Sequence, residues 1–197
     1  RYCGFCRRGC DCKSRNKSYI THMSHPYCAY VATISDVDDV DKNYHDNHYG
    51  VPIEDDNELF CRLVMEINQA GLSWHTILVK ENNFRNAYHN FDIKKVAKYG
   101  EKDFARLMND TGIIRNRLKI NAAIYNAQQL LLIQKEFGSF KDWLYIQSKE
   151  LRDDKLAWVK LFKKQFKFTG GEIVGEFLMS INLLPGSHGK ECIKFKK

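Results

Sequence analysis

The strongest constraint on the fold is a hydrophobic pattern with the period of an α-helix. In residues 116–137, "NRLKINAAIYNAQQLLLIQKEF", apolar side chains recur every three or four positions. Residues 55–71, "DDNELFCRLVMEINQAG", show the same period and open with Asp55 three residues before Glu58, as in a capping box. Both segments therefore predict amphipathic helices that bury one face.

Shorter segments show this period too. They predict further helices over residues 83–90, 93–99, 101–109, 139–147, 155–165 and 172–182, and the first long segment corresponds to a helix over residues 114–135. Alternation typical of a strand is confined to "YVATI", residues 30–34. There is no internal repeat, and the one candidate linker is the acidic segment "SDVDDVDKN", residues 35–43. The predicted fold class is therefore all-α.

The composition fits one folded domain. A chain of 197 residues with 44% hydrophobic and 13% aromatic content can bury a sizeable core. No run approaches the roughly 18 apolar residues that a membrane span requires, and the start of the chain carries charges where a signal peptide is apolar. We therefore expect a soluble cytoplasmic protein with no membrane partner.

Positive charge is concentrated at the start of the chain. The net charge is +7, but residues 1–22 hold six basic residues and one acidic residue, which leaves +2 for the remainder. The overall charge therefore does not by itself establish a nucleic-acid partner. We expect residues 1–22 to be a disordered or non-native leader before Met23, and residues 23–197 to form a single domain.

Four of the seven cysteines lie in this leader, as Cys3, Cys6, Cys10 and Cys12. Their spacing, C-x2-C-x3-C-x-C, admits a metal knuckle. The last two ligands are close together for a zinc site, however, and the segment has few apolar residues to pack around one. We assign the leader no function.

Glu66 is a carboxylate among apolar helix positions. At about 100° per residue it falls roughly 20° from Leu59, at the margin of the buried arc. Its side chain should therefore point inward or into a cleft. One explanation is a binding site, and the other is a structural ion pair with a buried arginine such as Arg115.

A glycine turn precedes the last predicted helix. Thr169, Gly170 and Gly171 stand in "FKFTGGEIVGEF", so backbone amides at the start of the helix face outward and can bind a phosphate. Most Gly-Gly turns are only turns, and this alternative remains open.

A set of metal-binding side chains is split between the two ends of the predicted domain. His188 and Cys192 form H-x3-C, and Cys28 and His45 lie near the start. Two sulfurs and two imidazoles make up a closed tetrahedral zinc set, which would tie both ends together. Spacing alone also permits unrelated surface and core residues.

The segments "YHDNHYGVPIEDDNELFCRLVMEINQAGLSWHTILVK", "GIIRNRLKINAAIYNA" and "FKFTGGEIVGEFLMS…LLPGSHGKEC" resemble the 3-methyladenine DNA glycosylase I family, a branch of the helix-hairpin-helix DNA glycosylases. The resemblance runs from about Cys28 to Cys192. It implies a monofunctional enzyme that removes N3-methyladenine from alkylated double-stranded DNA and leaves an abasic site. It also implies a monomer without a nucleotide cofactor, associated with the nucleoid.

The resemblance also assigns roles to residues. Glu66 matches the catalytic pocket glutamate that accepts hydrogen bonds from the damaged base. Four rings match the base-binding pocket, namely Tyr30, Tyr44, Tyr49, where many members have tryptophan, and Trp74. Residues matching the DNA contacts are Gly71 and Leu72, in a turn that enters the gap left by the flipped base, and Thr169, Gly170 and Gly171, in a phosphate-binding hairpin. The matching ligands of a structural zinc are Cys28, His45, His188 and Cys192.

Two departures and two alternatives accompany the resemblance. The acidic segment is longer than usual in the family and puts Asp41 where some members have an aromatic ring, and the chain is shorter than in some members between Phe140 and Leu156. The rings could be plain core residues.

The alternatives are a non-catalytic helix-hairpin-helix DNA-binding protein and a glycosylase for another base such as N3-methylguanine. His48 and His75 are expected to support the pocket from behind or to lie on the surface.

Overall fold

The computed structural model describes residues 24–195, in which all regular secondary structure is helical. The first half contains α2 (Pro26–Val31), α3 (Val40–Asn47), α4 (Asp56–Gln69), α5 (Trp74–Leu78), α6 (Glu81–Ala87), η1 (His89–Phe91) and α7 (Ile93–Val96). The second half contains α8 (Glu101–Asn109), α9 (Arg117–Phe137), α10 (Phe140–Leu151), α11 (Lys155–Gln165) and α12 (Gly171–Ser180). The prediction of an all-α protein is therefore confirmed for the described residues.

Most predicted helices occur within a few residues of their expected bounds, but the strand over residues 30–34 is wrong. Helix α2 takes up its first two residues, because Pro26 favours the first turn and His25 caps it by accepting from the amide of Cys28. The acidic segment is also less of a linker than expected. Asp39 caps α3, so half of the segment belongs to a helix or its cap.

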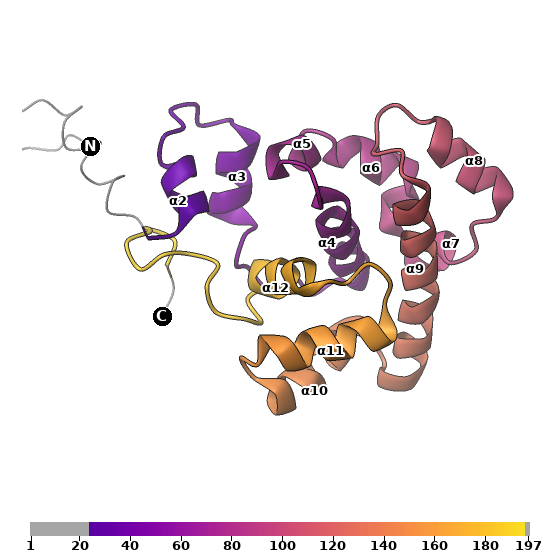
Figure 1. Ribbon diagram of the computed structural model, residues 1–197. Coiled ribbons are helices and arrows are strands. Elements are labelled where there is room, and N and C mark those ends of the chain that lie inside the picture. Colours follow the sequence, from indigo (N-terminus) through magenta and orange to yellow (C-terminus); the bar gives the residue numbers. More distant parts are fainter. Residues whose placement is uncertain (1–23, 196–197) are drawn as a thin grey trace, which may run out of the picture.

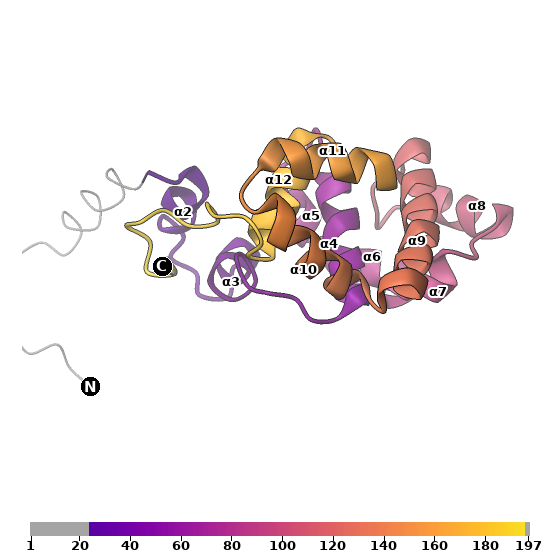
Figure 2. The same cartoon turned by 90° about the horizontal axis from the view of Figure 1, so that it is seen from below.

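Helix α4 lies at the centre of the molecule. It contacts α5, α9, α10 and α12, and its buried residues include Leu59, Leu63 and Ile67. Figures 1 and 2 show α12 and α11 on one side of α4, with α9 and the α7–α8 region beyond it. Asp55 caps α4 as predicted, but the side chain of Glu58 binds Arg85 at 2.7 Å instead of completing a capping box.

The segment after α12 returns to α2 and α3, and these three parts lie side by side in both views (Figures 1 and 2). Ser24 Oγ donates to Glu191 Oε2 at 3.0 Å across this junction. The two halves of the predicted ligand set are thereby brought together. The predictions for the leader, including Cys3, Cys6, Cys10 and Cys12, lie outside the described residues.

None of the helices in residues 24–195 combines the length and the apolar character that crossing a bilayer would require.

Candidate active site and metal centre

A pocket of about 580 Å³ opens between α2, α3, the ends of α4, α5 and α12. Pockets of this size hold small molecules in many proteins. Its walls combine aromatic rings with carboxylates, and its lining residues are His25, Pro26, Tyr27, Tyr44, Tyr49, Glu66, Gln69, Ala70, Gly71, Trp74, Glu172, Ile173 and Glu176.

Glu66 lies at this pocket and is only 4% exposed, as its helical position predicted. Its carboxylate forms no hydrogen bond with any described residue. Burial raises the pKa of Glu66 to about 8; the nearby Arg62 opposes this shift and Glu176 adds to it. The structural alternative, an ion pair with Arg115, is wrong because Arg115 is exposed. A buried carboxylate without a partner is costly, and this cost is typical of a ligand site.

Tyr44 and Trp74 form an aromatic wall, with ring centroids 5.1 Å apart. Arg62 Nη1 donates to Tyr44 Oη at 2.9 Å, and its guanidinium lies 4.8 Å from the centre of the same ring. Tyr49 packs against Tyr44 at 5.7 Å. Nε1 of Trp74 is buried and has no hydrogen-bond partner among the described residues, so one polar group of this wall is unsatisfied.

Tyr30 lies apart from the other predicted pocket rings. Its side chain is 47% exposed and is absent from the pocket lining, while Tyr27, which the sequence did not single out, lines it. The two rings stack at 6.3 Å. The one-turn spacing between them puts both on one face of α2, and only the helix orientation decides which ring is inside.

Glu176 is a second pocket carboxylate that the sequence analysis missed. It projects from α12 and accepts a hydrogen bond from Tyr49 Oη at 3.2 Å. Burial raises its pKa. The signal was present in "GEIVGEFLMS", where Glu176 interrupts an apolar helix face much as Glu66 does in α4.

Gly71 and Leu72 form the turn between α4 and α5 at the rim of the pocket. Gly71 has a φ of +85°, which favours glycine, and Leu72 is 39% exposed. The nearly buried Lys119 holds this turn, because its Nζ donates to the carbonyl oxygens of Asn68 and Ala70, both at 2.9 Å. The apolar tip is thus presented to solvent on a fixed backbone.

The predicted phosphate-binding hairpin connects α11 and α12, which pack against each other. Thr169 is buried and donates to the carbonyl of Phe166. Gly170 and Gly171 begin α12, whose first amides receive no side-chain cap. Asn126 fixes the hairpin by accepting from the amide of Lys167 and donating to its carbonyl, at 2.8 and 3.1 Å. The arrangement leaves backbone donors free for an anion.

Asp41 does not face solvent from the acidic segment. It is 1% exposed, and its carboxylate lies 2.5 Å from Nδ1 of His75 and within reach of Tyr27 Oη. The acidic segment therefore turns this carboxylate inward, away from any ligand on the surface. His75 supports the pocket from behind and His48 is exposed, in line with the expectation for both residues.

The two ends of the described chain bring Cys28, His45, His188 and Cys192 together, with ligand atoms within 4.8 Å of one another. The sulfur-to-nitrogen distances are 3.4 to 3.7 Å. Tetrahedral zinc with bonds of about 2.3 Å to sulfur and 2.0 Å to nitrogen separates such atoms by about 3.5 Å. The donor set and its spacing therefore fit a four-coordinate metal ion.

The outer nitrogens of both imidazoles are also fixed. His45 Nδ1 lies 2.8 Å from Asp46 Oδ1, and His188 Nε2 lies 3.0 Å from the carbonyl oxygen of Tyr49. Donation through these nitrogens leaves His45 Nε2 and His188 Nδ1 free to bind a metal ion, as in carboxylate–histidine–zinc arrangements. The four side chains would together complete a tetrahedral coordination sphere.

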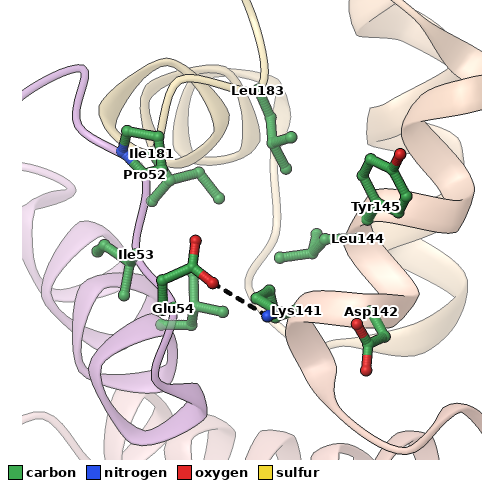
Figure 3. A pocket seen from close by; sticks show the side chains of 10 residues that line it. Pro52, Ile53, Glu54, Lys141, Asp142, Leu144, Tyr145, Ile181 and Leu183 are labelled. Carbon is green, nitrogen blue, oxygen red and sulfur yellow. Dashed lines mark hydrogen bonds and ion pairs between the residues drawn. The ribbon is translucent and has the colours of Figure 1, made fainter.

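A second cavity, of about 400 Å³, lies between residues 52–54, α10 and the segment after α12. Figure 3 shows it lined largely by apolar side chains, with Glu54 and Lys141 paired across it at 3.0 Å. None of the predicted site residues contributes to this cavity. It therefore carries no candidate chemistry.

An all-helical scaffold thus holds an aromatic pocket around a buried carboxylate, and such a pocket suits a flat, positively charged ligand. The profile of the family described as methyladenine glycosylase matches residues 34–158, and this chain belongs to that family.

The relatives agree with this placement. DNA-3-methyladenine glycosylase 1 of Escherichia coli K12 is 37% identical over 158 residues, 72% of this chain and 84% of the relative. DNA-3-methyladenine glycosylase of Haemophilus influenzae is 34% identical over 166 residues, 76% of this chain and 89% of the relative.

Solved structures are similar as well. A crystal structure of 3-methyladenine DNA glycosylase I has a TM-score of 0.73 and 34% identity, and the match covers 82% of this chain and 97% of that one. A variant of 3-methyladenine DNA glycosylase I in complex with 3-methyladenine has a TM-score of 0.74 and 30% identity. That match covers 87% of this chain and 98% of the other.

Proposed function

We propose that this protein is a DNA-3-methyladenine glycosylase, which hydrolyses the N-glycosidic bond of N3-methyladenine in alkylated double-stranded DNA. Membership of the family and the names of its relatives support this activity, as does the solved relative in complex with 3-methyladenine. Water adds to the sugar carbon as the bond to the base breaks. The departing base takes the bonding electrons, and an abasic site remains.

The observation that carries the proposal is the buried carboxylate of Glu66 beside the rings of Tyr44 and Trp74. Methylation at N3 gives the base a positive charge, which makes it a good leaving group. The pocket then needs to select a flipped cationic base more than it needs a strong acid. A carboxylate attracts such a base strongly where water is excluded, and aromatic faces add cation–π attraction.

Each predicted pocket residue has a proposed role. Glu66 accepts hydrogen bonds from the edge of the base. Tyr44 and Trp74 enclose it, and Tyr49 closes the far end of the pocket. Tyr30, exposed beside Tyr27, packs against the nucleotide at the entrance.

The DNA contacts are proposed from the two turns that carry exposed groups. Leu72, presented by the turn at Gly71, fills the gap that the flipped base leaves in the duplex. The amides at Gly170 and Gly171 bind a backbone phosphate, and Thr169 fixes their loop. The α11–α12 pair thus serves as a helix-hairpin-helix element, and exposed Lys163, Lys164 and Lys167 add positive charge beside it.

We propose zinc as the metal of the Cys28, His45, His188 and Cys192 cluster, because two thiolates and two imidazoles suit zinc best. Bound zinc would fasten the chain after α12 to α2 and α3. Those helices carry the tyrosines of the pocket, so the metal would stabilise the site without joining the reaction.

The remaining proposals concern the whole protein. Residues 23–197 form a single domain that acts as a monomer without a nucleotide cofactor, and residues 1–22 add nothing to its activity. The protein works in the cytoplasm, associated with the nucleoid.

The test is release of free N3-methyladenine from methylated duplex DNA by the full chain and by Glu66→Gln. The parent should release the base, and the variant should lose at least about a hundredfold in rate while it stays folded. A folded parent that binds DNA and releases nothing would leave a non-catalytic binding protein. Release of N3-methylguanine in the same assay measures the lesion range.

A further inference from the structure

The pocket has carboxylates on two different helices. Glu66 projects from α4 and Glu176 from α12, and these helices pack directly against each other. Both side chains line the same pocket as Trp74. Glu66 is buried and unpartnered, so the pocket already carries one group that needs a ligand. Glu176 is a second acidic group of the pocket, and it comes from a different helix.

Glu176 is held in a defined position. Its Oε2 accepts from Tyr49 Oη at 3.2 Å, and its side chain forms no other hydrogen bond with the described residues. Tyr49 is itself fixed, because its ring is buried and its carbonyl oxygen lies 3.0 Å from His188 Nε2. The remaining acceptor capacity of Glu176 is therefore available on the side of the pocket.

We infer that Glu176 contacts the flipped base together with Glu66, and that the two carboxylates make the pocket select a positively charged base over a neutral one. This inference rests on the proposed function and deepens it. Two acceptors from different helices in one pocket match a methylated purine, which carries both positive charge and an amino group. A neutral base would leave the negative charge of the pocket without any compensating charge.

Both carboxyl groups are harder to ionise in the folded protein than in water. Burial is the main reason that the pKa of Glu66 rises to about 8, so its protonated form dominates in the free pocket near pH 7. The pKa of Glu176 is also raised by burial, but the Tyr49 hydroxyl and Lys155 oppose that rise. After burial, the Glu176 carboxylate adds to the rise in the pKa of Glu66, so the ionisation of Glu66 depends on Glu176.

The charged and titratable groups around the pair come from several elements. Those named with the pair or lining its pocket are Arg62 of α4, Tyr44 of α3, Tyr49 after α3, Lys155 of α11, Glu172 of α12, and His25 and Tyr27 at α2. Arg62 is the basic group that lowers the pKa of Glu66, and it is already bound to the Tyr44 hydroxyl. It therefore does not neutralise the pair completely.

The experiment compares the full zinc-loaded chain with Glu176→Gln, and uses Glu136→Gln as a control with the same change of charge at an exposed position on α9. Binding is measured with 3,9-dimethyladeninium, whose charge does not titrate, and with the neutral 9-methyladenine. Release of N3-methyladenine from methylated duplex DNA is then followed in single turnovers from pH 5.5 to 9.

Glu176→Gln should weaken binding of the cation about tenfold and leave binding of the neutral base unchanged. It should also shift the acid limb of the release profile to lower pH, because Glu66 then loses its proton more easily. Glu136→Gln should behave as the parent does. A mere packing role would weaken both ligands equally and leave the pH profile in place, and that result would overturn the inference.

Failure of the proposed function would look different. A parent that binds the cation through Glu176 but releases no base from DNA would contradict the glycosylase and leave the role of Glu176 intact. If the parent releases the base but Glu176→Gln binds both ligands normally, the glycosylase activity is supported and the role of Glu176 is contradicted.

Discussion

The buried carboxylate of Asp41 lies 2.5 Å from Nδ1 of His75 and thereby ties α3 to α5. These helices carry Tyr44 and Trp74, the two rings of the pocket wall. The pair therefore positions the aromatic wall from behind.

Removal of His75 should destabilise the protein and loosen this wall. Among residues 24–195, His75→Ala leaves the Asp41 carboxylate with the Tyr27 hydroxyl as its one remaining side-chain partner, and we expect a loss of about 2 kcal/mol in the free energy of unfolding. Urea unfolding of His75→Ala, Asp41→Asn and the double variant measures the coupling directly. Strictly additive effects of the two substitutions would show that the contact has no energetic weight.

Glu66→Gln should stabilise the protein at alkaline pH. Because burial raises the pKa of Glu66 to about 8 in the folded state, its contribution to stability is fully present below pH 4.5, the ordinary value, and is lost as the pH rises toward 8. At pH 8 the variant should gain up to roughly 4 kcal/mol, since one pKa unit corresponds to about 1.4 kcal/mol. Thermal unfolding from pH 4 to 9 tests this. Equal stability of the two proteins at both ends of the range would refute it.

Loss of one metal ligand should separate the two ends of the domain. Cys192→Ser should reduce bound zinc from one ion per chain to none and lower the stability by about 3 kcal/mol, or roughly 10 °C in Tm. Elemental analysis and calorimetry measure both effects. Cys61→Ala is the matched control, because Cys61 is a buried cysteine outside the cluster. Full zinc occupancy in Cys192→Ser would contradict the assignment.

Leu72→Ala should impair activity on duplex DNA without unfolding the protein. The side chain is partly exposed at the rim of the pocket, so its truncation should change stability by less than about 0.5 kcal/mol. Base release from duplex DNA should fall about tenfold or more, while binding of the free base stays unchanged. Leu156→Ala truncates a different exposed leucine, which lies on α11, and should change neither the stability nor the rate of base release. Equal rates for the two variants would exclude a role for Leu72 in base flipping.

Local patterns were sufficient where a signal is contained in a few adjacent residues. The helical period placed α4, α8 and α11 correctly, and Asp55 marked the start of α4. The inward orientation of Glu66 also followed from its angle relative to Leu59. The strand over residues 30–34 failed because β-branched and aromatic residues there were outweighed by Pro26 and the His25 cap at the helix start.

The sequence by itself determined the helical class, the inward carboxylate of α4 and, through its resemblance, the family. Only the tertiary structure decided which groups meet Glu66, since Glu176 lies 110 residues away in the chain and reaches the pocket through the packing of α12 on α4. The same holds for Asp41, whose charge is buried against His75 instead of facing solvent. Periodicity fixes the face of a helix on which a side chain lies, but the partners of that face depend on how distant helices pack.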